Sequence, residues 1–349
     1  MADGGAIGQA SGVRFGLVDH TETRDDRPLS TVYAEHTQLA KAADEAGLWG
    51  YHTTEHHLSP FDATPSPSVY LAALAPQTHQ IQLGSLVHIV PGYHPVRLAE
   101  EVIMLDHLSN GRLQMGVGKG VNAPEHRLLD VDTETVDDLF LEHLERMVGV
   151  LEGTPVDGAP IPFTPLQQPY PPLWYAGNAA RAAELNLHVI IGGSAESVAD
   201  QVKEHRRIQQ AESSSPLQMR YNPTVRHTTV GVTRQVLVDR HSQRARSRAV
   251  ESWQTFSQHL THHFDRTGER SLHDPASGGD AARAMAVGAI TAGSPQQVAE
   301  AYIELAEAGA DYLLGVFFWG NLDLPDALSS FELFVTDVIP AVEASLAGR

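Results

Sequence analysis

The chain has 349 residues, 42% of them hydrophobic, which suits either two ordinary domains or one large α/β barrel. Its formal net charge of -19 disfavours a nucleic-acid or anionic-membrane partner, and the absence of cysteine excludes disulfides, thiolate metal sites and a cysteine nucleophile. No apolar run reaches the about 18 residues that a membrane span requires, and residues 1–12 lack the features of a signal peptide. We therefore expect a cytoplasmic protein that begins with a flexible tail at 1–12.

Strand and helix patterns alternate from the start of the chain. The first strand is expected at 13–19 and a helix at 30–46, which ends at Gly47. The second strand, 48–54, leads directly into Glu55-His56-His57. Pro67 then fits the first turn of the next helix, where its missing N–H costs nothing.

Residues 81–120 form a complete strand–helix–strand unit. The β-branched run at 81–90 predicts a strand buried on both faces. Pro95 fits the start of a helix, and Asn110-Gly111 ends it. The next strand, 112–117, leads into Gly118-Lys119-Gly120. Such a unit belongs to a parallel sheet with a right-handed connection, in which ligands bind at the carboxyl ends of the strands.

The rest of the chain continues the alternation. A polar loop is expected at 121–132, and Ser294-Pro295-Gln296-Gln297 forms a capping box. The Gly-, Asp- and Ser-rich segment 263–280 predicts a mobile lid. Further strands are expected at 173–176, 187–191, 228–239 and 311–318, and helices at 133–151, 195–211, 242–262, 295–309 and 328–346. Eight strands alternating with helices predict one (β/α)8 TIM barrel with insertions over 13–349.

The loops after the strands carry the candidate chemical groups. His56 and His57 follow the second strand, and because neighbours on an extended chain point oppositely, one of them faces the barrel mouth. The pattern fits equally well a structural histidine in the loop, with its ring bonded to a backbone carbonyl. The glycine-rich turn with Lys119 suits a phosphate, although a plain tight turn explains the motif as well.

Two further glycine motifs lie between a strand and a helix. They are Gly177-Asn178 and Gly192-Gly193-Ser194, and a helix start favours anions. Ordinary loop chemistry explains each motif taken singly. The histidines at 52, 56, 57, 88 and 94 do not predict a metal site, because no acidic ligand recurs at a fixed spacing and no HxH follows the first strand.

These motifs together resemble the bacterial luciferase-like flavin monooxygenase family. The resemblance rests on Ala43 to Trp49, Glu55-His56-His57, Pro67 to Ala75 and the whole block 81–120. It continues at 171–178, 237–246 and 292–300, and through the last strand and helix. Several separated motifs therefore agree in order and position.

The resemblance implies a luciferase-like (β/α)8 barrel that binds reduced FMN as a co-substrate. It implies that dioxygen reacts with the flavin to form a flavin hydroperoxide, which oxidises a small organic substrate. A separate flavin reductase would supply the reduced flavin, and a homodimer would form through helices near 66–78 and 95–108. Two alternatives stay open: a deazaflavin-dependent hydride-transfer oxidoreductase and a catalytically silent flavin-binding barrel.

The resemblance also assigns residues. His56 matches the active-site histidine of the family, with a role in hydrogen bonding and proton transfer. Lys119 stands where luciferases have a phosphate-binding arginine, and Gly118 where they have a reactive cysteine. The match predicts a cis peptide between Leu86 and Val87 beneath the flavin ring. Gly177 and Asn178 are further phosphate ligands by position.

Overall fold

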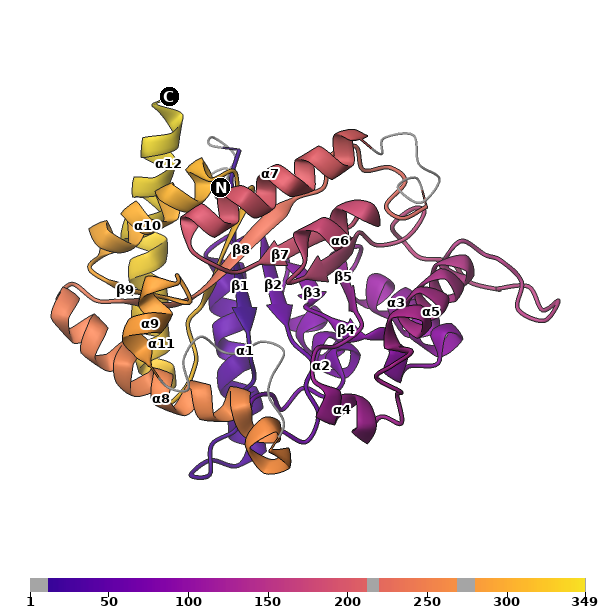
Figure 1. Cartoon of the computed structure of the whole chain (residues 1–349), viewed down its shortest axis with the longest axis horizontal. Helices are drawn as coiled ribbons and strands as arrows, with labels where there is room; N and C mark the ends of the chain where they lie inside the picture. The colour runs from indigo at the N-terminus through magenta and orange to yellow at the C-terminus, as the bar shows by residue number, and fades with distance from the viewer. Residues whose placement is uncertain (1–11, 212–219, 269–279, 349) are drawn as a thin grey trace.

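Parallel strands close into a barrel in the computed structural model, which describes residues 12–211, 220–268 and 280–348 (Figure 1). The barrel order is β1-β2-β3-β5-β6-β7-β8-β10, and β10 pairs again with β1. The barrel strands are β1 (Arg14–Asp19), β2 (Gly50–Thr53), β3 (Gln82–Ser85), β5 (Leu113–Gly118), β6 (Leu173–Ala176), β7 (His188–Ile191), β8 (Val230–Val238) and β10 (Tyr312–Val316). Two short strands extend the sheet, β4 (His88–Ile89) beside β5 and β9 (Ile290–Gly293) beside β8. The expected (β/α)8 barrel is confirmed.

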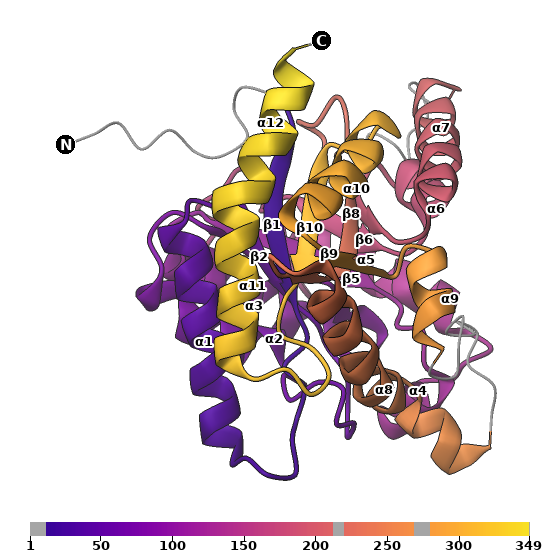
Figure 2. The ribbon, with the colours of Figure 1, turned by 90° about the vertical axis from the view of Figure 1, so that its left-hand side faces the viewer.

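Helices surround the strands (Figures 1 and 2). They are α1 (Leu29–Glu45), α2 (Pro67–Leu74), α3 (Pro95–Leu108), α4 (Ala123–Leu128), α5 (Val136–Leu151), α6 (Ala179–Glu184), α7 (Ala195–Ala211), α8 (Ser242–Thr267), α9 (Ala281–Ala286), α10 (Pro295–Glu307), α11 (Leu324–Leu333) and α12 (Ile339–Ala347). Short turns η1 (Ala75–Gln77), η2 (Val90–Gly92) and the π-helical η3 (Phe334–Val338) complete the described elements. The main hydrophobic core lies between the strands and these helices.

Aromatic side chains fill the inside of the barrel away from its carboxyl-terminal mouth. Trp174 and Tyr312 are fully buried with their ring centroids 5.8 Å apart, and the Tyr312 hydroxyl lies 3.2 Å from Nε2 of His52. A Cβ atom on Gly16 would lie 1.9 Å from that hydroxyl, so only glycine leaves room for the tyrosine. Inside the barrel, space for a ligand therefore lies near the mouth.

Several expected elements differ in the structure. The strand expected at 81–90 stops at Ser85 and resumes at His88, because the backbone turns at Leu86-Val87. Within the expected loop 121–132, residues 123–128 form helix α4, which begins after Asn122 with proline in its first turn. The last helix is interrupted by η3, just before Pro340, whose ring nitrogen cannot donate a backbone hydrogen bond.

The segment expected as a lid begins within a helix. Helix α8 continues to Thr267 because Phe264 and His263 are buried against the barrel and extend its apolar face. Residues 269–279 of the expected lid, and residues 1–11 of the expected tail, lie outside the described residues. The capping box at Ser294 and Gln297 is confirmed at the start of α10.

Candidate active site

A cavity of about 400 Å³ opens at the carboxyl ends of the barrel strands. Every site residue expected from the sequence lies on its wall, which comes mainly from the loops after β2, β3, β5 and β6. The lining residues are Glu55, His56, Leu86, Val87, Ile89, Gly118, Lys119, Gly120, Val121, Glu125, Tyr175, Ala176, Gly177 and Asn178. The volume falls in the range of small-molecule and cofactor sites.

One wall of the cavity is formed by the end of β3 against the end of β5. The predicted cis peptide between Leu86 and Val87 is confirmed. A Cβ atom on Gly118 would lie 2.5 Å from Cγ2 of Val87, which is closer than two carbon atoms can approach. Glycine at position 118 therefore leaves room for the Val87 side chain at this wall.

His56 reaches the cavity from the loop directly after β2. Its Nδ1 atom lies 3.1 Å from Oε1 of Glu125, a side chain that is almost fully buried. The ring of His56 also packs edge-on against Phe61 at 4.8 Å between ring centroids. These contacts fix the imidazole at the cavity wall and assign Nδ1 to the carboxylate.

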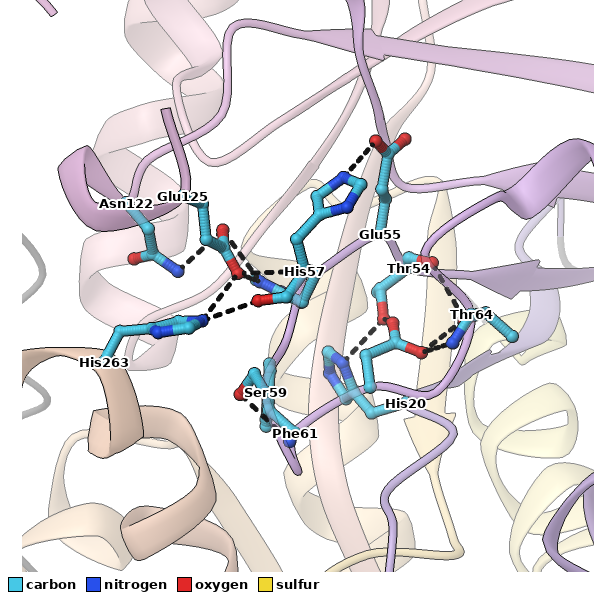
Figure 3. Close-up of polar contacts among 12 residues, drawn as sticks. His20, Thr54, Glu55, His57, Ser59, Phe61, Thr64, Asn122, Glu125 and His263 are labelled. Carbon is cyan, nitrogen blue, oxygen red and sulfur yellow. Dashed lines mark hydrogen bonds and ion pairs between the residues drawn. The ribbon is translucent and has the colours of Figure 1, made fainter. Parts of the chain in front are cut away.

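Glu125 is a functional candidate that the sequence reasoning missed. It lies in the first turn of α4 and accepts hydrogen bonds from the backbone N–H of His57 at 3.1 Å and from the Asn122 amide at 3.0 Å (Figure 3). The sequence contained a signal for the helix, although not for the contact with His56. Asn122 followed by Pro124 and Glu125 is a helix start, and it places a carboxylate at the barrel mouth.

The pKa values of the His56–Glu125 pair move in opposite directions. Burial alone lowers the pKa of His56, but the adjacent carboxylate of Glu125 outweighs it and raises the pKa above its usual value. Burial likewise opposes ionisation of Glu125, yet the imidazolium and the hydrogen bonds to the carboxylate lower its pKa. Both shifts favour a protonated, cationic His56 beside an ionised Glu125.

His57 points away from this pair. Its Nε2 atom lies 2.9 Å from Oε1 of Glu55, whose other oxygen accepts the backbone N–H of Ile89 at 3.1 Å and the hydroxyl of Tyr93 at 3.0 Å. Of the two neighbouring histidines, His56 lines the cavity and His57 braces the loop through Glu55. The carbonyl oxygen of His57 lies 2.6 Å from Nε2 of His263 on α8 (Figure 3).

A second polar cluster lies behind His56. Nδ1 of His20 lies 3.0 Å from Oγ1 of Thr54, and Thr54 donates a hydrogen bond to Asp62. Asp62 also accepts the backbone N–H of Thr64 at 2.8 Å. Burial lowers the pKa of His20 to about 3 and raises that of Asp62 to about 6, so His20 is neutral at neutral pH.

Lys119 and Asn178 provide the polar donors of the cavity. Nζ of Lys119 forms an ion pair with Asp137 on α5 at 2.8 Å. Oδ1 of Asn178 accepts the backbone N–H of Arg181 at 2.9 Å, which leaves its NH2 group as a donor. Gly177 has a φ of +84° and open space where a Cβ atom would lie. Together the two side chains provide an ammonium group and an amide for an anionic group.

Within 12–211, 220–268 and 280–348, no group of three or more His, Cys, Asp or Glu side chains could hold a metal ion. In the same ranges, no helix is both long enough and apolar enough to cross a membrane.

Comparisons with known proteins were made on the whole chain. The model of the luciferase-like monooxygenase family matches residues 13–312. Protein y4wF of Sinorhizobium fredii is 30% identical over 91% of this chain and 94% of its own length. The oxygenase component of the flavin-dependent trigonelline monooxygenase of Acinetobacter baylyi is 31% identical over 49% of this chain and 51% of its own length.

Solved structures share the fold. The oxygenating constituent of 3,6-diketocamphane monooxygenase of Pseudomonas putida, solved in complex with FMN, has a TM-score of 0.76 at 20% identity over 94% of this chain and 98% of that one. The coenzyme F420-dependent tetrahydromethanopterin reductase of Methanopyrus kandleri has a TM-score of 0.65 at 18% identity over 94% and 99%. At these identities the likeness shows the barrel architecture.

Proposed function

The chain belongs to the luciferase-like monooxygenase family, and from this premise we propose that it uses reduced FMN and dioxygen to oxidise a small organic substrate in the cavity beside His56. The observation that carries the proposal is the set of residues on this cavity wall. The wall brings together three features: an imidazole bonded to a buried carboxylate, a glycine at 118 packed against Val87, and a cation with an amide donor.

These residues fit FMN in size and chemistry. Lys119 and the NH2 group of Asn178 would hold the phosphate, with Gly177 leaving the backbone open beside it. Leu86 and Val87 would provide the apolar support for the flavin ring. The family membership and the flavin-dependent relative support a flavin, and the FMN complex on the same barrel supports FMN in particular.

His56 is the residue that we propose to hold and move the proton. Glu125 accepts the Nδ1–H, so Nε2 is the ring nitrogen left for a group in the cavity. When bound, reduced FMN would supply the electrons for activating dioxygen. His56 would donate a hydrogen bond or a proton from Nε2 to an oxygen atom in the cavity, and its raised pKa keeps that proton available near neutral pH.

Two partners follow from the same proposal. The trigonelline relative is named an oxygenase component, which supports a separate flavin reductase as the source of reduced FMN. A homodimer is supported by exposed apolar side chains on the neighbouring helices α2 and α3. Val69, Met104 and Leu108 are 70%, 62% and 56% exposed.

An anaerobic titration followed by mixing with dioxygen tests the proposal. We expect the protein to bind reduced FMN and to change the rate at which the flavin reoxidises, as measured by stopped-flow absorbance. The deazaflavin alternative is favoured by the fold of the F420-dependent reductase, whose TM-score to this chain is lower than that of the FMN complex. Tight binding of a reduced deazaflavin with no binding of FMN would establish that alternative instead. FMN binding with unchanged reoxidation would indicate a catalytically silent barrel.

A further inference from the structure

A second cavity, of about 520 Å³, lies on another side of the barrel. It is bounded by the loop after β7, the middle of β8, strand β9 and helices α8, α9 and α10. Of these elements, β8, β9, α9 and α10 can be followed in Figure 2. Its lining shares no residue with that of the cavity beside His56. Whatever binds here therefore does not need the flavin cavity.

A buried arginine lies on the wall of this second cavity. Arg234 on β8 is 3% exposed, and its guanidinium donates to the carbonyl oxygens of Thr233, at 2.8 Å, and Gly193. Among the described residues, no carboxylate forms an ion pair with it. Burial lowers the pKa of Arg234 to about 10, so the side chain is still cationic at neutral pH. A buried cation without a counter-charge is unfavourable unless an anion compensates for it.

The charge around the cavity favours an anion. Arg246 on α8 is a second arginine on the wall, and Glu304 on α10 is the acidic residue among the described lining residues. The cavity thus has an excess of positive charge in a chain whose formal net charge is -19. Ser194 and Thr291 add hydroxyl groups that can donate to oxygen atoms.

The glycine motif at 192–194 forms part of the same wall. Gly288, with a φ of +75°, brings the turn after α9 against it, since a Cβ atom there would lie 3.0 Å from the Gly193 carbonyl oxygen. No residue of this motif lines the cavity beside His56. Here it forms one side of a cleft whose other sides hold the two arginines.

We propose that this cavity is a second binding site, for the carboxylate or phosphate group of a small metabolite, in which Arg234 and Arg246 contact the oxyanion. A guanidinium has five N–H donors, and the two carbonyl bonds of Arg234 leave others for a ligand. Its planar fork matches both carboxylates and phosphates. The residues therefore select for a negatively charged group that presents oxygen atoms.

Isothermal titration calorimetry on the full chain tests the proposal, with inorganic phosphate and succinate as separate probes at an ionic strength held constant with sodium chloride. The titrations use the Lys119→Ala variant, which removes the lysine that we assign to the FMN phosphate. We expect one of the two anions to bind with one-to-one stoichiometry. Binding of phosphate alone assigns the site to phosphate groups, and binding of succinate alone assigns it to carboxylates. Binding of neither anion would refute the site.

Variants on the wall locate the binding. In the same background, Arg246→Ala should weaken binding by roughly threefold to tenfold, and Glu304→Gln should strengthen it by removing a like charge. Arg244→Ala is the matched control, because Arg244 lies on the same helix, pairs with Asp239 and does not line the cavity. Equal affinities in the Arg246→Ala and Arg244→Ala proteins would refute the role of this cavity.

The buried arginine has its own variant. Arg234→Met, with its fold checked by circular dichroism, should lower the affinity for the anion by about tenfold or more. Undiminished binding in a folded Arg234→Met protein would show that the arginine only braces the loop at Gly193. Should this variant not fold, the comparison of the exposed Arg246 and Glu304 variants still decides the outcome. An FMN titration of Arg246→Ala, with Lys119 intact, should give wild-type affinity because the two cavities are separate.

Discussion

The Nδ1 atom of His56 lies 3.1 Å from the Oε1 atom of Glu125, and this contact joins the loop after β2 to the short helix α4. The two residues are separated by 69 positions in the sequence. Because the carboxylate occupies one ring nitrogen, the other nitrogen is the one available in the cavity. The contact thereby determines both the orientation and the charge of the imidazole.

Replacement of His56 should affect chemistry more than binding. In His56→Ala, turnover of the reduced flavin with an organic substrate should fall by about 10²–10⁴-fold, because a positioned proton donor is lost. The affinity for FMN should change much less. Stopped-flow kinetics and an equilibrium flavin titration measure the two quantities. A loss of affinity alone would assign His56 to positioning. His57→Ala is the comparison, since His57 does not line the cavity.

The His56–Glu125 pair should make stability depend on pH. The raised pKa of His56 means that its contribution is complete below 6.5 and is lost as pH rises through the folded-state pKa. The lowered pKa of Glu125 means that its contribution is present above 4.5 and is lost as pH falls through the folded-state pKa. Denaturant unfolding should show Glu125→Gln less stable by about 1–3 kcal/mol, with the largest difference between pH 4.5 and 6.5. A difference that is constant with pH would rule out the ion pair.

Lys119 and Asp137 should have opposite effects on flavin affinity. Lys119→Ala should weaken FMN binding by about 1.5–3 kcal/mol, the value of a charged hydrogen bond. Asp137→Asn should strengthen it, because Asp137 pairs with Lys119 at 2.8 Å and competes with a phosphate for the ammonium group. Fluorescence titration with FMN measures the affinities of both variants, with Lys203→Ala on α7 as the control. Unchanged affinity in both variants would remove Lys119 from the phosphate site.

A side chain at position 118 should disturb the cavity wall. In Gly118→Ala, the new Cβ atom would lie 2.5 Å from Cγ2 of Val87, so Val87 has to move. We expect a loss of about 1–3 kcal/mol in stability and weaker FMN binding. Gly192→Ala is the control, because its Cβ atom would have nothing within 4 Å. Thermal unfolding of the two variants gives the comparison, and equal melting temperatures would contradict the expected clash.

The exposed side chains of α2 and α3 should be an interface between two copies of the chain. Light scattering after size exclusion should give the mass of two chains for the wild type. Met104→Asp should give the mass of one chain, because it introduces a charge into the apolar contact. Val250→Asp, at an exposed position on α8, should leave the dimer intact. A monomeric wild type, or a dimeric Met104→Asp, would exclude this interface.

The sequence predicted the barrel because its strands are short apolar runs with clear ends. The strand 173–176 and the helix 195–211 were placed at the bounds that the structure has. Both the strand and the helix are followed by glycine, asparagine or other polar residues. Such residues favour turns, so the nearby sequence determines where each element ends. By contrast, β9 (Ile290–Gly293) was missed because its sequence, ITAG, contains one large apolar side chain and gives no apolar run, unlike the equally short strand 173–176.

Only part of the candidate site was predictable from the sequence. His56 and Lys119 follow strands directly, so their place at the mouth can be read from strand order. Glu125 lies on a helix of one and a half turns within polar sequence, where no apolar period marks the helix. Its contact with His56 depends on how α4 packs, which is a tertiary property. Arg234 was missed because an arginine inside a strand gives no sign of burial.

The bond between His263 and the carbonyl oxygen of His57 has a consequence for the evolution of this enzyme. It links α8, in the second half of the chain, to His57, whose backbone N–H donates to Glu125 in the first half. Nε2 of His263 also lies 3.8 Å from Oε1 of Glu125, so a substitution at either of these two positions changes the surroundings of the other. Among homologues that keep His56, positions 125 and 263 should therefore covary.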